Sequence, residues 1–129
     1  DFGICIDTTI AYDVPGNSGY DRITELGKGT AIKIMDTSVI SDYRMVEFMK
    51  QTASKNKIKY QLEILTGGGT DAAGIQKMAK SGAIVGAVSV PTRHIHQVIE
   101  TCHNEDIRGS IDLLKASISS LDKFDWSFK

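Results

Sequence analysis

The chain has 129 residues, of which 41% are hydrophobic and 24% are charged, and its formal net charge is −1. This length suits one domain with a substantial core and is too short for two. The near-zero charge gives no electrostatic case for binding nucleic acid or an anionic membrane, and no apolar run approaches the roughly 20 residues that span a bilayer. Cys5 and Cys102 form neither a CxxC motif nor a disulfide framework, which favours a soluble protein of the reducing cytoplasm.

The first half of the chain predicts two strands, a loop between them and then a helix. In chain order these are a strand over residues 2–11, a loop over 17–29, a strand over 30–35 and a helix from Ser41 or Asp42 to about Asn56. The first strand ends where Asp13 and the following Pro-Gly impose a turn. The helix carries Val46, Met49 and Ala53 on one face, as expected for a helix that packs on a sheet.

The second half alternates strands and helices. The expected elements are a strand over 60–65, a helix over 72–80 closed by Gly82, a strand over 83–90, a short strand over 98–102 and a helix over 105–121. The strand over 83–90 is apolar throughout, which is typical of the buried interior of a parallel or mixed sheet. The last helix is amphipathic, with an apolar face of Ile107, Ile111, Leu114 and Ile118. This alternation predicts an α/β layered fold.

Polar residues follow three of the predicted strands. Asp13 follows the first strand, the loop at residues 67–71 (GGGTD) follows the third, and His96 follows the fourth. In open α/β sheets, ligands bind at the edge where the strands end. We therefore expect Asp13, this glycine loop and His96 to lie on one edge of the sheet.

Taken singly, these residues have more than one interpretation. An Asp before Pro-Gly is also a common turn former, and a lone His is also a common structural residue. His94 and His96 would share a face on a strand and could bind one metal ion together. The glycine loop lacks the Lys-Ser/Thr of a P-loop, so it is either a tight turn with Thr70 or Asp71 as helix cap, or a set of amides facing a substrate carboxylate.

Four segments taken together carry a stronger signal. They are residues 7–16 (DTTIAYDVPG), 26–29 (LGKG), 68–72 (GGTDA) and 91–96 (PTRHIH). In this order they resemble the dinuclear-metal aminopeptidases, the glutamyl aminopeptidase and TET peptidase family, whose members are often labelled cellulases or endoglucanases. The resemblance extends from residue 4 to about residue 121. It implies a zinc-peptidase-like fold, a mixed α/β sheet flanked by helices.

The resemblance also implies specific roles. Two divalent ions, zinc or cobalt, would be bound in part by Asp13 and His96. His94 stands where the family usually has Tyr, so we expect a surface ring, or a ring beside the site, and not a ligand. Gln97 and Thr30 depart from the Ser and Pro that are usual there. Gly68, Gly69, Thr70 and Asp71 would help shape the substrate pocket, and Arg93 would either orient the loop that carries His96 or contact substrate.

The remaining parts of the family's site have no matching motif in this sequence. The resemblance implies a further His ligand, a bridging Asp and a Glu-Glu pair that includes the general base. We expect them upstream, so that residues 1–129 are the C-terminal portion of a metallopeptidase catalytic domain and are inactive alone. The intact protein would cleave residues from peptide N-termini and form dimers that assemble into a dodecamer.

Two other functions remain open. A glycoside hydrolase needs two carboxyl groups about 5–10 Å apart in a sugar groove, and no such pair stands out in a chain with only 7% aromatic residues. A non-catalytic fragment that acts as a folded scaffold is the other alternative.

Overall fold

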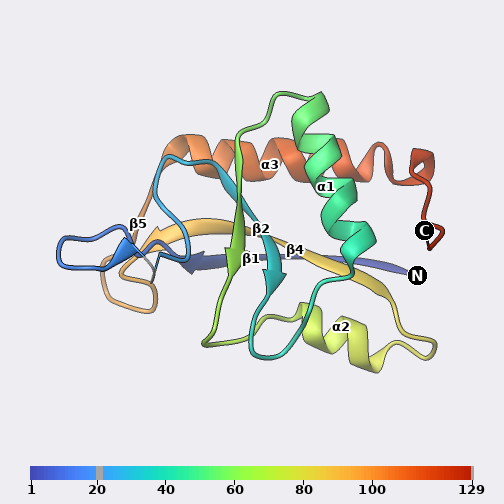
Figure 1. Ribbon diagram of the computed structural model, residues 1–129, viewed down its shortest axis with the longest axis horizontal. Coiled ribbons are helices and arrows are strands. Elements are labelled where there is room, and N and C mark those ends of the chain that lie inside the picture. The colour runs from blue at the N-terminus through green and yellow to red at the C-terminus, as the bar shows by residue number, and fades with distance from the viewer. Residues whose placement is uncertain (20–21, 129) are drawn as a thin grey trace.

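A computed structural model describes residues 1–19 and 22–128 of the chain. Over this part of the chain, five strands form a mixed sheet with helices on both sides (Figure 1). The strands are β1 (Phe2–Ile10), β2 (Thr30–Met35), β3 (Tyr60–Ile64), β4 (Ile84–Arg93) and β5 (Thr101–Cys102). The helices are α1 (Tyr43–Lys55), α2 (Ala72–Met78) and α3 (Asn104–Ile118), followed by a 3₁₀ turn at Leu121–Lys123. The mixed α/β fold is therefore confirmed.

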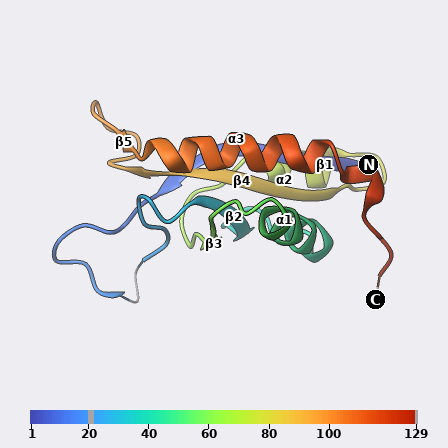
Figure 2. The same ribbon diagram turned by 90° about the horizontal axis from the view of Figure 1, so that it is seen from above.

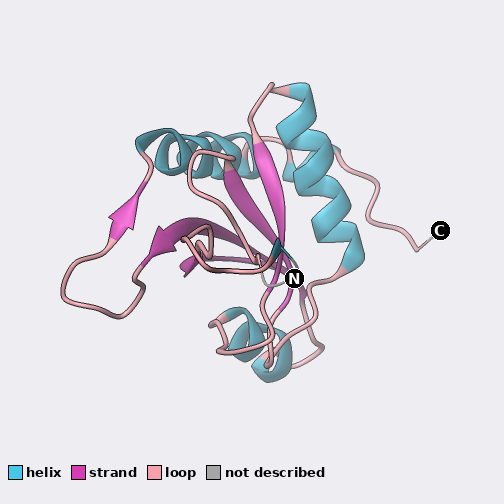
Figure 3. Ribbon diagram, turned by 60° about the vertical axis from the view of Figure 1, so that its left-hand side comes forward, coloured by secondary structure: helices cyan, strands magenta, loops and turns pink. Residues whose placement is uncertain are grey.

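The sheet combines two parallel pairs of strands that run in opposite directions. Its strand order is β1-β4-β2-β3, with β5 added to the end of β4. β1 is parallel to β4 and β2 is parallel to β3, whereas β2 and β4 are antiparallel and pair only at Ala31–Ser89 and Ile32–Val88. Figure 1 and Figure 3 show β2 and β3 crossing the β1–β4 pair steeply. The carboxyl ends of β1 and β4 therefore lie together, away from those of β2 and β3.

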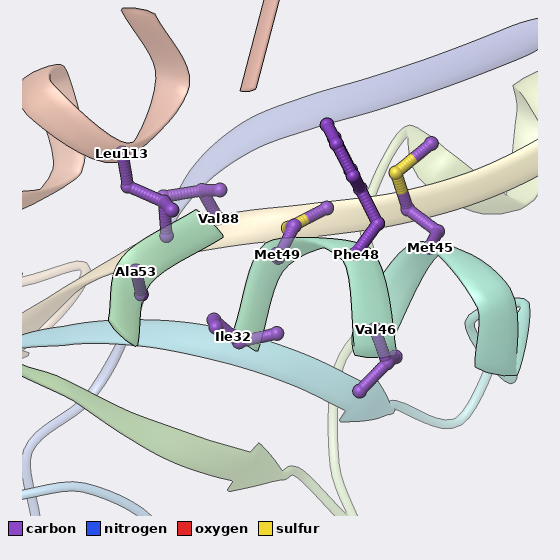
Figure 4. Packing of buried hydrophobic residues seen from close by; sticks show 8 residues of the cluster. All are labelled: Ile32, Met45, Val46, Phe48, Met49, Ala53, Val88 and Leu113. Atoms are coloured by element: carbon purple, nitrogen blue, oxygen red, sulfur yellow. The ribbon is translucent and has the colours of Figure 1, made fainter. Parts of the chain in front are cut away.

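The main hydrophobic cluster lies between α1, α3 and the sheet. Asp42 caps α1 by accepting a hydrogen bond from the Arg44 amide, so Asp42 is the cap and Ser41 is not. One face of α1 buries Met45, Phe48 and Met49 against the sheet. Figure 4 shows these side chains together with the other members of the cluster, which are Ile32, Val46, Ala53, Val88 and Leu113. On the opposite face, α2 covers β1 and β4, as Figure 1 shows.

The buried face of α3 is not the one that the sequence predicts. Ile107, Ile111 and Ile118 are 37%, 59% and 65% exposed. The residues that α3 buries are Asp106, Ser110, Leu113 and Ser117. The reason is polar: Asp106 and Ser110 form hydrogen bonds to residues at and before the start of β2, and these bonds fix how the helix is rotated. Figure 2 shows α3 lying along the β1–β4 pair.

Most of the other predicted boundaries agree with the structure to within one or two residues. β4 continues three residues beyond Val90 to Arg93, because β1 and β5 pair with its last residues. Only Thr101–Cys102 of the predicted strand over 98–102 is extended, since Val98 and Ile99 lie in an exposed turn. Residues 20 and 21 of the predicted loop over 17–29 lie outside the described residues. Among the helices that are described, none is long and apolar enough to cross a bilayer.

Candidate functional site

The centre of the candidate site is a bidentate ion pair between Asp13 and Arg93. The Arg93 Nε donates to Asp13 Oδ1 over 2.7 Å, and its terminal nitrogen donates to Asp13 Oδ2 over 2.9 Å. The pair joins the ends of β1 and β4, which are adjacent parallel strands, with Ile10 opposite Thr92. A planar guanidinium matches a carboxylate in this geometry, so the pair fixes both the position and the orientation of Asp13.

Asp13 is held in its charged form. The hydrogen bonds from Arg93 lower the pKa of Asp13, against the opposing effect of burial, and the Leu26 amide lowers it further. Its side chain is 13% exposed, compared with 36% for Arg93. Arg93 was predicted to orient the loop that carries His96 or to contact substrate, and two of its guanidinium nitrogens donate here to Asp13. Each Asp13 oxygen accepts a hydrogen bond from Arg93, and Oδ2 accepts a second from the Leu26 amide, so most of the acceptor positions of this carboxylate are occupied.

The loop between β1 and β2 also contributes to Asp13. The Leu26 amide donates to Asp13 Oδ2 over 3.0 Å. Gln61 on β3 holds the same loop, since its side-chain amide donates to the carbonyl oxygens of Glu25 and Gly29 and its carbonyl oxygen accepts from the Glu25 amide. The LGKG segment, known from the sequence only as part of a resemblance, therefore has a structural role beside Asp13.

His94 and His96 lie in a turn after β4 and not on a strand. Both are exposed, and both have left-handed backbones, with φ of 59° and 64°. Left-handed backbone costs of order 1–3 kcal/mol at a non-glycine residue and persists only where the surroundings impose it. Here the His96 amide donates to the Glu100 carboxylate over 2.6 Å, and the Gln97 amide donates to the His94 carbonyl. Sequence reasoning missed Glu100, which carries no motif of its own.

The glycine loop does not share the edge of Asp13. It follows β3, which runs opposite to β4, and it contacts the turn after β2. Thr37 binds the Gly68 carbonyl through its amide and hydroxyl, and Thr70 donates to Asp36 over 3.0 Å. The single-edge prediction is therefore wrong for this loop, because the β2–β3 pair is antiparallel to β1–β4. Asp71 occupies the N-cap of α2 without a capping side-chain bond.

A buried charged cluster that sequence reasoning missed lies between the two strand pairs. Lys33 and Glu63 are fully buried and form a close ion pair, and Lys33 Nζ is 3.7 Å from Asp36 Oδ2. Thr9 of β1 donates to Glu63 Oε1 over 2.7 Å, so the cluster joins β1, β2 and β3. Burial raises the pKa of Asp36, but hydrogen bonds from Ser38 and Thr70 and the charge of Lys33 hold it below its usual value.

The metal ligands predicted here are incomplete within this chain. Across residues 1–19 and 22–128, no group of three or more His, Cys, Asp or Glu side chains is arranged to hold an ion. Asp13 and His96 offer a carboxylate and an imidazole, which are common donors for zinc. The chemistry of these donors therefore fits a divalent ion, while the number of ligands does not complete a site.

Comparison with known proteins decides the family. Residues 1–113 match the M42 glutamyl aminopeptidase family. The chain belongs to this family. One relative, the glutamyl aminopeptidase of Lactococcus lactis, is 30% identical over 122 residues, which cover 95% of this chain and 33% of that protein.

Solved structures of an aminopeptidase and of a TET peptidase share this fold. An aminopeptidase from the archaeon Desulfurococcus kamchatkensis is 39% identical with a TM-score of 0.88, covering 92% of this chain and 34% of that one. The TET1 peptidase of Pyrococcus horikoshii, which can assemble into a tetrahedron or a large octahedral shell, is 28% identical with a TM-score of 0.67, covering 88% of this chain and 32% of that one. This M42 chain thus spans about a third of the length of its relatives.

Proposed function

We propose that this chain is the C-terminal portion of the catalytic domain of a metal-dependent aminopeptidase and supplies part of its metal centre. The observation that carries the proposal is the Asp13–Arg93 ion pair, which joins the paired ends of β1 and β4 directly before the His94–His96 turn. Membership of the M42 family supports it, as do the aminopeptidase names of the relatives. These names also favour peptide substrates over glycosides.

In this proposal Asp13 and His96 each contribute one ligand to a pair of divalent ions, zinc or cobalt. When bound, such ions polarise a scissile carbonyl and lower the pKa of a water molecule. Asp13 suits the role because Arg93 and the Leu26 amide already hold it ionised and oriented. The further ligands and the glutamate base belong, in this proposal, to the rest of a longer protein.

In this proposal, two other residues of the chain position the side chains of Asp13 and His96. Arg93 fixes the Asp13 carboxylate plane, and Glu100 holds the left-handed turn from which His96 projects. The predicted contacts of Gly68, Gly69, Thr70 and Asp71 with substrate stay predictions. Their contacts with the turn after β2 support a role in shaping the loop before α2.

The longer protein would act in the cytoplasm on peptide N-termini. The assembly of its Pyrococcus horikoshii relative into closed shells supports a homo-oligomer, which we expect to be a dodecamer built from dimers.

The histidine pair gives the sharpest test. In the full-length protein, His96→Ala should abolish metal-dependent hydrolysis of aminoacyl-anilides and lower the bound metal, because a ligand is lost. His94→Tyr should retain most activity and metal. Equal losses from both substitutions would show that the two histidines bind metal together. Hydrolysis of soluble cellulose, with aminoacyl-anilides left intact, would favour the glycoside hydrolase alternative.

A further inference from the structure

The outer edge of β1 is an unpaired strand edge. Over the described part of the chain, β1 pairs with β4 and with no other strand. The Ala11 amide donates to the Thr92 carbonyl over 3.0 Å, so the odd-numbered residues of this segment direct their backbone polar groups toward β4. Because these groups alternate along a strand, the amides of Phe2, Ile4 and Ile6 point away from β4. None of the three amides has an acceptor among the described residues.

The chain itself covers only the last part of this edge. The Thr24 hydroxyl donates to the Ile10 carbonyl over 2.7 Å, and the Thr8 amide donates to the Asp7 carboxylate over 2.8 Å. The opposite edge of the sheet, β3, has five residues and a register shift in its pairing, and both features discourage further pairing. β1 has nine residues in an unbroken register, with no proline and no lysine. It therefore has the character of a strand that is paired on both sides.

An exposed isoleucine lies beside this edge. Side chains two residues apart on a strand share a face, so Ile6 lies on the face where Ile4 packs against the main hydrophobic cluster. Ile6 is nevertheless 58% exposed. α3 lies along the β1–β4 pair, as Figure 2 shows, and it leaves this part of β1 uncovered.

The exposed isoleucines of α3 lie on its flank toward β1. A Cβ on Gly109 would lie 3.8 Å from Ile58 Cγ2 and 3.7 Å from the Lys59 carbonyl oxygen. Ala116 lines a cavity with Asn56 and Ile58. One flank of α3 therefore faces the segment between α1 and β3. The other flank, about half a turn away at 3.6 residues per turn, faces the β1 side of the sheet and carries Ile107, Ile111 and Ile118.

We propose that the outer edge of β1 and the isoleucine flank of α3 form one surface, which the rest of a longer protein covers with a strand beside β1 and an apolar helix beside α3. This inference rests on the proposed function in treating the chain as a portion of a longer protein, and it involves no metal ligand.

The length of the relatives supports an occupant from the same polypeptide. The chain covers 34% of the Desulfurococcus kamchatkensis aminopeptidase and 33% of the Lactococcus lactis enzyme, so about two thirds of each relative lies outside the matched portion. A segment of the same polypeptide is present at a high effective concentration, which favours it over a separate partner. An added strand supplies acceptors for the free amides of β1, and an apolar helix removes the isoleucines from water.

Hydrogen exchange of the full-length protein, read at single residues by mass spectrometry, tests the strand. The Ile4 and Ile6 amides should exchange at least about 100-fold more slowly than unpaired amides, as expected for the interior of a sheet. Thiol labelling tests the helix. Ile111→Cys should react at least about 100-fold more slowly than the control Met78→Cys, because burial blocks the reagent. Met78 is 85% exposed on α2, which lies on the opposite face of the sheet.

The outcomes separate this inference from the proposed function. Exchange of the Ile4 and Ile6 amides at the rate of unpaired amides would overturn the inference, and the proposed function would stand if the protein still cleaved aminoacyl-anilides. Slow exchange in a protein without aminopeptidase activity would support the inference and refute the proposed function. Protection that is present in the oligomer and lost in separated monomers would assign the surface to a second copy and overturn the inference. The exchange experiment uses the wild-type protein, so it decides the matter even if Ile111→Cys does not fold.

Discussion

Replacing Lys33 by Met should destabilise the protein strongly, because Lys33 is the cation of a buried charged cluster. Its side chain and that of Glu63 are fully buried, and Asp36 is 2% exposed. Met has a similar length and leaves little cavity, so the substitution chiefly removes charge. Glu63 then keeps one hydrogen bond, from Thr9, and its Oε2 atom already lacks a partner among the described residues.

The size of the effect follows from the fate of the Glu63 carboxylate. Without Lys33 the Glu63 carboxylate stays buried and loses its ion-pair partner. Removing one partner of a buried ion pair costs roughly 3–5 kcal/mol. For a chain of this length, the corresponding loss is roughly 10–20 °C in the thermal midpoint.

Chemical denaturation of the single and double variants tests this reasoning. Adding Glu63→Gln should restore much of the stability, since the amide oxygen can still accept from Thr9 and residue 63 then carries no charge. A loss below about 1 kcal/mol from Lys33→Met, or no recovery in the double variant, would refute the assignment of Lys33 as an essential counter-charge.

Two further substitutions test the surroundings of Asp13. Arg93 lowers the pKa of Asp13 in the folded protein. The stability that their pairing contributes is therefore fully present above the ordinary pKa of Asp, near 4, and this contribution is lost as the pH falls through the lower pKa of the folded state. Arg93→Met should therefore destabilise the protein at neutral pH by an amount that vanishes in acid, and a pH-independent deficit in urea midpoints would contradict this. Gly29→Ala should cost at least about 2 kcal/mol, while Gly74→Ala, whose new Cβ meets nothing within 4 Å, should be neutral or slightly stabilising in the same assay.

Local patterns predicted most of the elements because each depends on residues close in sequence. The apolar spacing of α1 and its cap at Asp42 lie within one segment, and α1 forms as expected. The continuous apolar run of β4 likewise predicted a buried strand, which is paired on both sides. The pattern did not predict that β4 continues to Arg93, since those last residues are extended through their pairing with β1 and β5.

The errors arise where distant residues decide the structure. The isoleucine spacing of α3 is a valid apolar stripe, but Asp106 and Ser110 bond residues about 80 positions away and turn the opposite face inward. Local periodicity also does not reveal whether β2 runs parallel or antiparallel to β4. Because the two strands are antiparallel, the glycine loop after β3 lies at the other edge of the sheet from Asp13, although both follow predicted strands.

The contacts of Asp13 could not be predicted from any one segment of the sequence. Asp13, the LGKG loop and Arg93 are separate segments in the sequence, and in the structure all three meet at one carboxylate. Each oxygen of Asp13 accepts from Arg93, and one accepts also from Leu26. A carboxylate that served only as a turn former before Pro-Gly would bond to amides beside it in sequence. The partners of Asp13 lie 13 and 80 residues away, so its carboxylate joins distant segments as well as any local turn.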